Sequence, residues 1–315
     1  MGVLRQCILT IILREAELMD SKFILSCEST VDLPFAYIDG RDIPVLFYHY
    51  TVDGMDYEDD MCRKPGAKEE FYGLLDAGKF PATSQLNEFT YYEFFSQFSG
   101  KGKLLHIAFG TGMTSSYNNA IAAVERLKSE NFDCEIEVID SLCSSSGYGM
   151  LVDYAADMRD EGCTLEETAE WVFAHRQRIH HQFFSTDLKY FRKSGRVSGT
   201  AATIGAILNI CPIMRLDDRG RIIAYDKVRG RHNAIKRMVD TMIGHAEGAG
   251  SYSGKCFICN SNDQADAEKL KEAIEARVPA LKDKIRICDI GSIIAAHCGP
   301  NTVAVFFMGD ERAPE

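Results

Sequence analysis

Four clusters of serine and threonine stand where predicted strands end or helices begin. The sequence GTGMTSS, residues 110–116, lies between an apolar strand-like run, 104–109, and a helical pattern that begins near residue 117. In α/β proteins such a turn commonly holds an anion, because glycines let backbone N–H groups approach it and hydroxyls add further donors. The other clusters are Ser29/Thr30, Thr83/Ser84 and Ser141/Ser144. The sequence therefore predicts an anion site lined by neutral hydroxyls.

Known catalytic and nucleotide-binding motifs do not fit these clusters. The segment GTGMTS matches the dinucleotide fingerprint until Ser115, which stands where a third glycine should allow close helix–sheet packing. Gly254-Lys255 lacks the other residues of a P-loop, and neither G-x-S-x-G nor H-E-x-x-H occurs. The one candidate base is His297, which we expect in a loop bounded by glycine and proline. Three roles are open for it: the base of a hydrolase, a buried structural histidine, or part of a clamp that holds a carboxylate.

Three arginines offer the positive charge that suits an anion site. Arg196, in the glycine-rich segment 194–199, is able to recognise an anion, contact a partner or satisfy backbone carbonyls. Arg229 and Arg231 form a local basic patch, either at a partner surface or at the solvated start of a helix. The adjacent His180-His181 cannot share one helix face, so we expect them in a solvated loop.

Composition and charge limit the classes of function. The 315 residues hold 46 acidic against 35 basic side chains, a net charge of −11, which disfavours nucleic acid and anionic membrane surfaces as partners. The 11 cysteines are scattered, and the single CxxC, Cys256 to Cys259, lies in a strand-like run. This pattern favours reduced structural cysteines and a cytoplasmic protein. The apolar run 7–13 is too short to span a bilayer, so we expect no stable membrane insertion.

The spacing of apolar residues predicts two α/β domains after an N-terminal extension, residues 1–20. Over 21–178 strands alternate with helices, which is typical of a three-layer domain with a parallel sheet. Its predicted strands are 23–26, 43–50, 104–109 and 135–139. The stretch 53–62 is expected to be irregular, and Thr83 or Ser84 to cap a helix that begins near Asn87. Over 179–315, a helix at 200–209, a hairpin turn at 217–220 and later helices indicate a mixed sheet.

Six segments, in order along residues 23–308, resemble the DegV family of fatty-acid-binding proteins. They are CESTVDLP at 27–34, PATSQ at 81–85, GMTSSY at 112–117, VIDS at 138–141, SGRVSG at 194–199 and AHCGP at 296–300. Three positions depart from the family pattern: Glu28 replaces an aspartate, Leu86 a proline and Thr114 a serine. The resemblance implies a two-domain DegV-like fold, with a parallel-sheet domain, a mixed-sheet α/β domain and a fatty acid buried between or within them.

By the same resemblance, the protein is a carrier without a catalytic centre or cofactor of its own. The motif positions imply that Thr83 and Thr114 bind the carboxylate of a long-chain fatty acid. The resemblance also implies that His297 lies close to the carboxylate and that Arg196 serves the head-group region or a partner contact. We expect the neighbouring Ser84 and Ser115 to bind the carboxylate too, and the basic patch of Arg229 and Arg231 to share the role of Arg196. The implied partner is a separate bacterial fatty acid kinase subunit that phosphorylates the carboxylate to an acyl phosphate. A phosphate-ester-binding α/β protein and an acyl-ester hydrolase using His297 remain alternatives.

Overall fold

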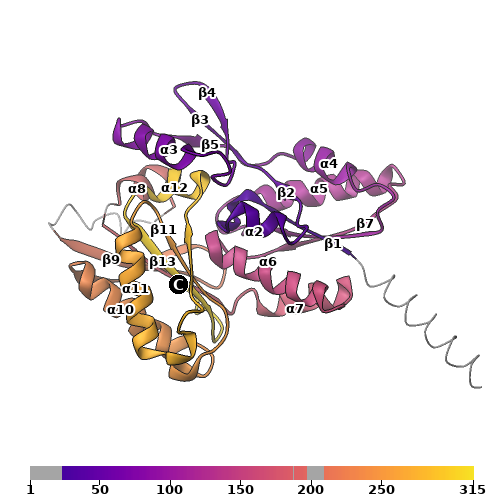
Figure 1. The fold of residues 1–315 in the computed structure, drawn as a ribbon. Coiled ribbons are helices and arrows are strands. Elements are labelled where there is room, and N and C mark those ends of the chain that lie inside the picture. Colours follow the sequence, from indigo (N-terminus) through magenta and orange to yellow (C-terminus); the bar gives the residue numbers. More distant parts are fainter. Residues whose placement is uncertain (1–22, 187, 197–208) are drawn as a thin grey trace, which may run out of the picture.

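The computed structural model describes residues 23–186, 188–196 and 209–315, and the first sheet within these ranges is parallel, as the sequence predicts (Figure 1). Its strands lie in the order β2-β1-β6-β7, and each neighbouring pair is parallel. Their bounds are Phe23–Glu28 for β1, Val45–Leu46 for β2, Lys103–Ala108 for β6 and Glu135–Asp140 for β7. Side chains along β6 from Leu104 onward are buried, as expected for a sheet covered on both faces.

The second sheet of the described chain is mixed, again as predicted. Its strands lie in the order β10-β9-β8-β13-β11-β12; β11 and β12 pair in parallel and the other neighbours are antiparallel. The bounds are β8 Ile179–Ser185, β9 Ile210–Leu216, β10 Ile222–Arg229, β11 Cys256–Asn260, β12 Arg286–Asp289 and β13 Thr302–Met308. Every residue of β8 and β13 is buried, so these central strands form the core of this half.

Helices cover both sheets and one of them joins the two. Figure 1 shows α4 (Glu88–Ser96) and α5 (Ser116–Ser129) on one face of the parallel sheet, and α6 (Ser145–Asp160) and α7 (Leu165–His175) on the other. α6 also contacts β8, β11 and β13, so it forms a layer between the two sheets. Glycines make this possible: a Cβ on Gly147 would lie 2.2 Å from Nε2 of His181, and one on Gly149 would lie 2.4 Å from the Val31 carbonyl oxygen. α10 (Arg231–His245) and α11 (Gln264–Arg277) pack on the mixed sheet.

A small antiparallel sheet, β4-β3-β5, was not predicted. Its strands are β3 His49–Val52, β4 Met55–Glu58 and β5 Ala82–Thr83. The prediction of one strand over 43–50 and an irregular stretch over 53–62 was therefore wrong. The chain leaves the parallel sheet after Leu46 and turns back at Asp53-Gly54, where both residues have positive φ (50° and 81°). An Asp-Gly pair favours this two-residue hairpin turn, so the signal was present in the sequence.

Several local predictions also need correction. Asn87, rather than Thr83 or Ser84, caps α4, because its Oδ1 accepts a hydrogen bond from the Thr90 amide at 2.9 Å. His297 lies in a helix, α12 (Ser292–Cys298), and not in a loop. His180 and His181 are buried on β8 rather than solvated, and burial lowers the pKa of His180 to about 4 and that of His181 well below its usual value.

The remaining elements are short or lie at the edges of the two halves. They are η1 Ser29–Val31, α2 Phe35–Asp39, α3 Ala67–Asp76, α8 Lys189–Ser194, η2 Ala249–Ser251 and η3 Pro279–Leu281. The extension 1–20 and most of the helix predicted at 200–209 lie outside the described residues. In the part of the chain that is described, none of the helices combines the length and the apolar character needed to cross a bilayer.

Candidate functional site

A cavity of about 500 Å³ lies where the carboxyl ends of the parallel strands meet elements of the second half. This volume falls within the ~300–1,000 Å³ range of small-molecule sites. Its polar lining includes Tyr48, Thr83, Ser84, Gln85, Thr111, Thr114, Ser115, Ser144, Arg196 and His297. Its apolar lining includes Phe109, Met113, Phe191, Ile222, Ile293, Ile294 and Cys298. Among the described lining residues, Arg196 is the one guanidinium or ammonium group and no carboxylate occurs, which suits an anionic ligand.

The structure brings six of the eight predicted site residues to this cavity. They are Thr83, Ser84, Thr114, Ser115, Arg196 and His297. Arg229, at the end of β10, and Arg231, at the start of α10, are not among its lining residues. Arg231 instead forms ion pairs with Asp263 and, at 2.7 Å, with Asp266. Of the six, Thr114 and Ser115 follow β6 of the parallel sheet, as the strand-end rule expects, whereas Thr83 lies on β5 of the antiparallel sheet and His297 on α12. Local basic composition was no guide to the cavity.

Thr83 and His297 both line this cavity and contact each other directly. Thr83 Oγ1 lies 2.8 Å from His297 Nε2, whereas the buried Nδ1 of the same ring has no hydrogen-bond partner among the described residues. Burial, with a further contribution from the Arg196 guanidinium, lowers the pKa of His297 to about 4. At neutral pH the ring is therefore uncharged and offers one N–H donor.

The side chains of two buried aspartates hold the helix that carries His297. Asp32 Oδ1 accepts from the Gly291 amide at 2.9 Å, and Asp59 Oδ1 accepts from the Ser292 amide at 3.1 Å, so both bind the start of α12. Gly291 is required for this contact, because a Cβ there would lie 2.8 Å from Asp32 Oδ1. Burial raises the pKa of Asp32 well above its usual value and that of Asp59 to about 7.

A chain of buried hydrogen bonds supports Thr114. Thr114 Oγ1 lies 2.9 Å from Ser116 Oγ, which lies 3.0 Å from the Tyr48 hydroxyl; that hydroxyl donates to Glu28 Oε2 at 3.1 Å. Because the Glu28 carboxylate accepts the Tyr48 proton, Ser116 donates to Tyr48. The Ser116 amide also donates to Thr114 Oγ1 at 3.3 Å. Because Ser116 gives its own proton to Tyr48, the 2.9 Å contact requires that Thr114 donate to Ser116, so a bound carboxylate has to replace Ser116 as the acceptor of the Thr114 proton.

Glu28 is the centre of this network and was not predicted to be part of the site. It also accepts from the Phe109 amide at 3.1 Å and from the Tyr91 hydroxyl, and it lies 3.3 Å from His106 Nε2. Burial and the Glu28 charge raise the pKa of Tyr48 and Tyr91 well above the usual value, so both keep the protons that they donate. The only sequence signal was the unusual glutamate in the CESTVDLP segment.

The glycines of the 110–116 turn serve packing rather than ligand approach. A Cβ on Gly112 would lie 2.3 Å from the Gly220 carbonyl group, and one on Gly110 would lie 2.7 Å from the Cys143 carbonyl oxygen. The Gly110 amide donates to Cys143 O at 3.1 Å, and the Thr111 amide donates to Asp140 at 3.0 Å. The amides of Gly110 and Thr111 are therefore bound to protein acceptors and do not approach an anion, and hydroxyls of this turn line the cavity.

A smaller apolar chamber of about 60 Å³ continues from the cavity beneath the mixed sheet. The two share the lining residues Ser144, Phe191, Ile222, Ile294 and Cys298. The chamber is otherwise lined mainly by buried apolar side chains, namely Phe183, Leu216, Ile290, Ala304 and Phe306. Sequence reasoning missed these residues, because side chains that line a chamber and side chains of the core share one apolar pattern. The cavity thus has a polar end and an apolar end.

Comparison with known proteins agrees with this architecture. The family model described as "Uncharacterised protein, DegV family" matches residues 22–310. A DegV domain-containing protein of Clostridium perfringens is 33% identical over 294 residues, which cover 93% of this chain and 99% of that protein. The chain belongs to the DegV family.

Solved structures of other DegV proteins share the fold. A DegV family protein from Thermus thermophilus, described as binding fatty acid, has a TM-score of 0.80 at 21% identity and covers 92% of this chain and 100% of that one. A stearic-acid-binding protein from Eubacterium ventriosum also has a TM-score of 0.80 at 21% identity, and covers 91% and 98% of the two chains. At this identity the likeness establishes the fold of this DegV protein and leaves its ligand to be argued from its own residues.

Proposed function

We propose that this DegV protein binds a long-chain fatty acid, with the carboxylate at the polar end of the cavity and the hydrocarbon tail along the apolar end. Thr83 and Thr114 donate to the carboxylate, and Ser84, Ser115 and His297 lie beside it. The observation that carries the proposal is one cavity in which neutral donors and a single arginine continue into an apolar chamber. Descriptions of several solved DegV structures name a bound fatty acid, such as vaccenic or heptadecanoic acid, which supports it.

The two ends of the cavity would contribute to binding in different ways. Removing a methylene from water gains about 0.8 kcal/mol, so ~14 methylenes give about 11 kcal/mol before the costs of association. A carboxylate buried without partners would cost several kcal/mol, and the hydroxyls of Thr83 and Thr114 offset this cost. The tail therefore supplies affinity, while the hydroxyls fix the orientation of the acid.

The surroundings of His297 favour a carrier over an acyl-ester hydrolase. A hydrolytic histidine needs a third group that orients its second nitrogen, whereas within 23–186, 188–196 and 209–315 no residue pairs with Nδ1 of His297. A ring whose pKa is about 4 is also a weak general base at neutral pH. The Thr83–His297 pair is better suited to hold an anion than to activate a nucleophile.

In this proposal the acid is presented to a separate kinase subunit. An oxygen of the carboxylate attacks the γ-phosphorus of ATP held by that kinase, which yields an acyl phosphate and ADP. Neutral donors suit this step, because they hold the carboxylate without neutralising the charge that must attack. Arg196 would serve the head-group region, because it lines the cavity. Arg229, which is exposed at the end of β10, would contact the partner.

The first test is to identify what co-purifies with the protein. Mass spectrometry of the denatured, extracted sample should show a long-chain fatty acid close to one per chain, and a reproducible absence would contradict the proposal.

Turnover of acyl esters that is lost in His297→Ala would favour the hydrolase, and competition by phosphate esters would favour a phosphate-ester-binding protein. The kinase partner is tested by incubating a purified kinase with ATP. Acyl phosphate should form only when the fatty-acid-loaded protein is added.

A further inference from the structure

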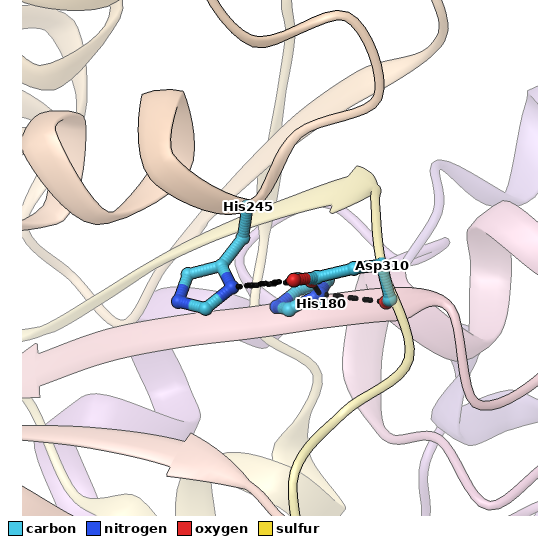
Figure 2. A group of neighbouring side chains, drawn as sticks. All are labelled: His180, His245 and Asp310. Atoms are coloured by element: carbon cyan, nitrogen blue, oxygen red, sulfur yellow. Dashed lines mark hydrogen bonds and ion pairs between the residues drawn. The ribbon is translucent and has the colours of Figure 1, made fainter.

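A second group of side chains outside the cavity has the composition of a metal site. It consists of His180 on β8, His245 at the last position of α10 and Asp310 just after β13 (Figure 2). His180 Nε2 lies 2.8 Å from Asp310 Oδ1, and His245 Nδ1 lies 3.1 Å from both carboxylate oxygens of Asp310. Across the described residues, this is the one trio of His, Cys, Asp or Glu side chains that comes close enough to share an ion.

The surrounding backbone fixes the three side chains. Gly309 lies against both histidines: a Cβ there would lie 2.3 Å from the His245 carbonyl oxygen and 2.9 Å from His180 Cδ2. The Asp310 amide donates to the His245 carbonyl at 3.1 Å, which ties the end of α10 to the chain after β13. The His180 ring stacks on Phe307 at 5.0 Å and on His245 at 5.1 Å. The ligand atoms are therefore held together before any ion binds.

The geometry matches a small divalent transition metal. Ligand atoms about 2.0–2.2 Å from a tetrahedral Zn²⁺ lie roughly 3.3 Å from one another, close to the 2.8 and 3.1 Å separations seen here. Two imidazoles and a carboxylate suit Zn²⁺ and related ions, whereas Mg²⁺ and Ca²⁺ prefer oxygen ligands. His180 is buried, but the side chains of His245 and Asp310 are 46% and 59% exposed, so an ion has an entry path and room for water.

We propose that His180, His245 and Asp310 form a binding site for a divalent transition metal such as Zn²⁺. The ion would replace the protons that now link the two imidazoles to the carboxylate, and would join β8, the end of α10 and the chain after β13. None of the three residues lines the cavity, so this site acts on the mixed-sheet half and not on the ligand directly.

The test uses full-length protein stripped of metal with a chelator and then titrated with ZnCl₂ by calorimetry, and with CoCl₂ by visible absorption. His245→Ala and Asp310→Asn each remove one exposed ligand without a change in the core. His232→Ala is the matched control, because it removes an exposed histidine from the same helix.

We expect one Zn²⁺ per wild-type chain, a higher melting temperature with Zn²⁺, and a Co²⁺ spectrum of tetrahedral type. Each ligand variant should bind at least about 100-fold more weakly, which exceeds the usual cost of losing an outer-sphere partner, while His232→Ala binds as wild type does. No binding by the wild type, or binding that both ligand variants retain, would overturn the proposal. Fatty acid content should be unchanged in all variants, so this result is independent of the proposed function.

Discussion

The sharpest test of the carboxylate clamp is Thr83→Val, which removes one hydroxyl and keeps the shape of the side chain. Thr83 is only partly buried on β5, but the change also leaves Nε2 of His297 without its 2.8 Å partner, so the free energy of unfolding should fall by about 1 kcal/mol. A hydrogen bond to a charged group contributes about 1.5–3 kcal/mol, so the Kd for a long-chain fatty acid should rise about 10- to 150-fold. Binding should not be abolished, because the tail still contributes on the order of 11 kcal/mol before costs.

The assay is calorimetric titration of delipidated protein with a long-chain fatty acid and with the alcohol of the same chain length. The alcohol lacks the charge, so Thr83→Val should weaken its binding far less than that of the acid. Thr51→Val is the matched control: Thr51 is a partly buried threonine on the neighbouring strand β3, and it does not line the cavity. A Kd for the acid that stays within about twofold of wild type, or an equal loss for acid and alcohol, would refute the clamp.

Three further predictions address the supports of the site. Glu28→Gln should raise the Kd for the acid about tenfold and lower the free energy of unfolding by about 2–4 kcal/mol in urea titrations, because Glu28 accepts several buried hydrogen bonds. Asp59→Asn should stabilise the protein at pH 8 by up to about 4 kcal/mol, since burial raises the pKa from 3.8 to about 7 and ionisation opposes folding. This gain should shrink as the pH falls from 7 toward 4 in thermal melts. Gly112→Ala should lower the melting temperature, because its Cβ would lie 2.3 Å from Gly220.

Each of these predictions has an outcome that would contradict it. A wild-type Kd for the fatty acid in Glu28→Gln would show that Glu28 does not support the residues that bind the carboxylate. A gain in Asp59→Asn that is equal at pH 4 and pH 8 would show that Asp59 is not the group that titrates. An unchanged melting temperature in Gly112→Ala would mean that the 110–116 turn and Gly220 can move apart without loss of stability.

The alternation of strands and helices was enough to predict the parallel sheet, and the hydroxyls after its strands were enough to place Thr114 and Ser115 at the edge where parallel strands end. Thr83, on the antiparallel strand β5, and His297, on α12, were predicted to lie near them from the family resemblance. The His180-His181 prediction, by contrast, failed. Two adjacent polar side chains suggest a loop, but in this structure each is buried against tertiary partners, such as Asp310 for His180, that no local pattern contains.

The Glu28 network was beyond prediction for a similar reason, since its members come from β1, the loop after β2 and the start of α5. A hydroxyl donor is useful for binding only if its proton is free to face the ligand. At Thr114 the proton belongs to the chain in the free protein: Tyr48 donates to Glu28, Ser116 donates to Tyr48 and Thr114 donates to Ser116, so a carboxylate has to draw the Thr114 proton away from Ser116. One buried carboxylate thus fixes the proton direction along the whole chain of hydroxyls. Glu28 touches no ligand in the proposed mode, so its effect on the affinity for an acid should come from holding Tyr48 and Ser116 in place behind Thr114 rather than from a direct contact.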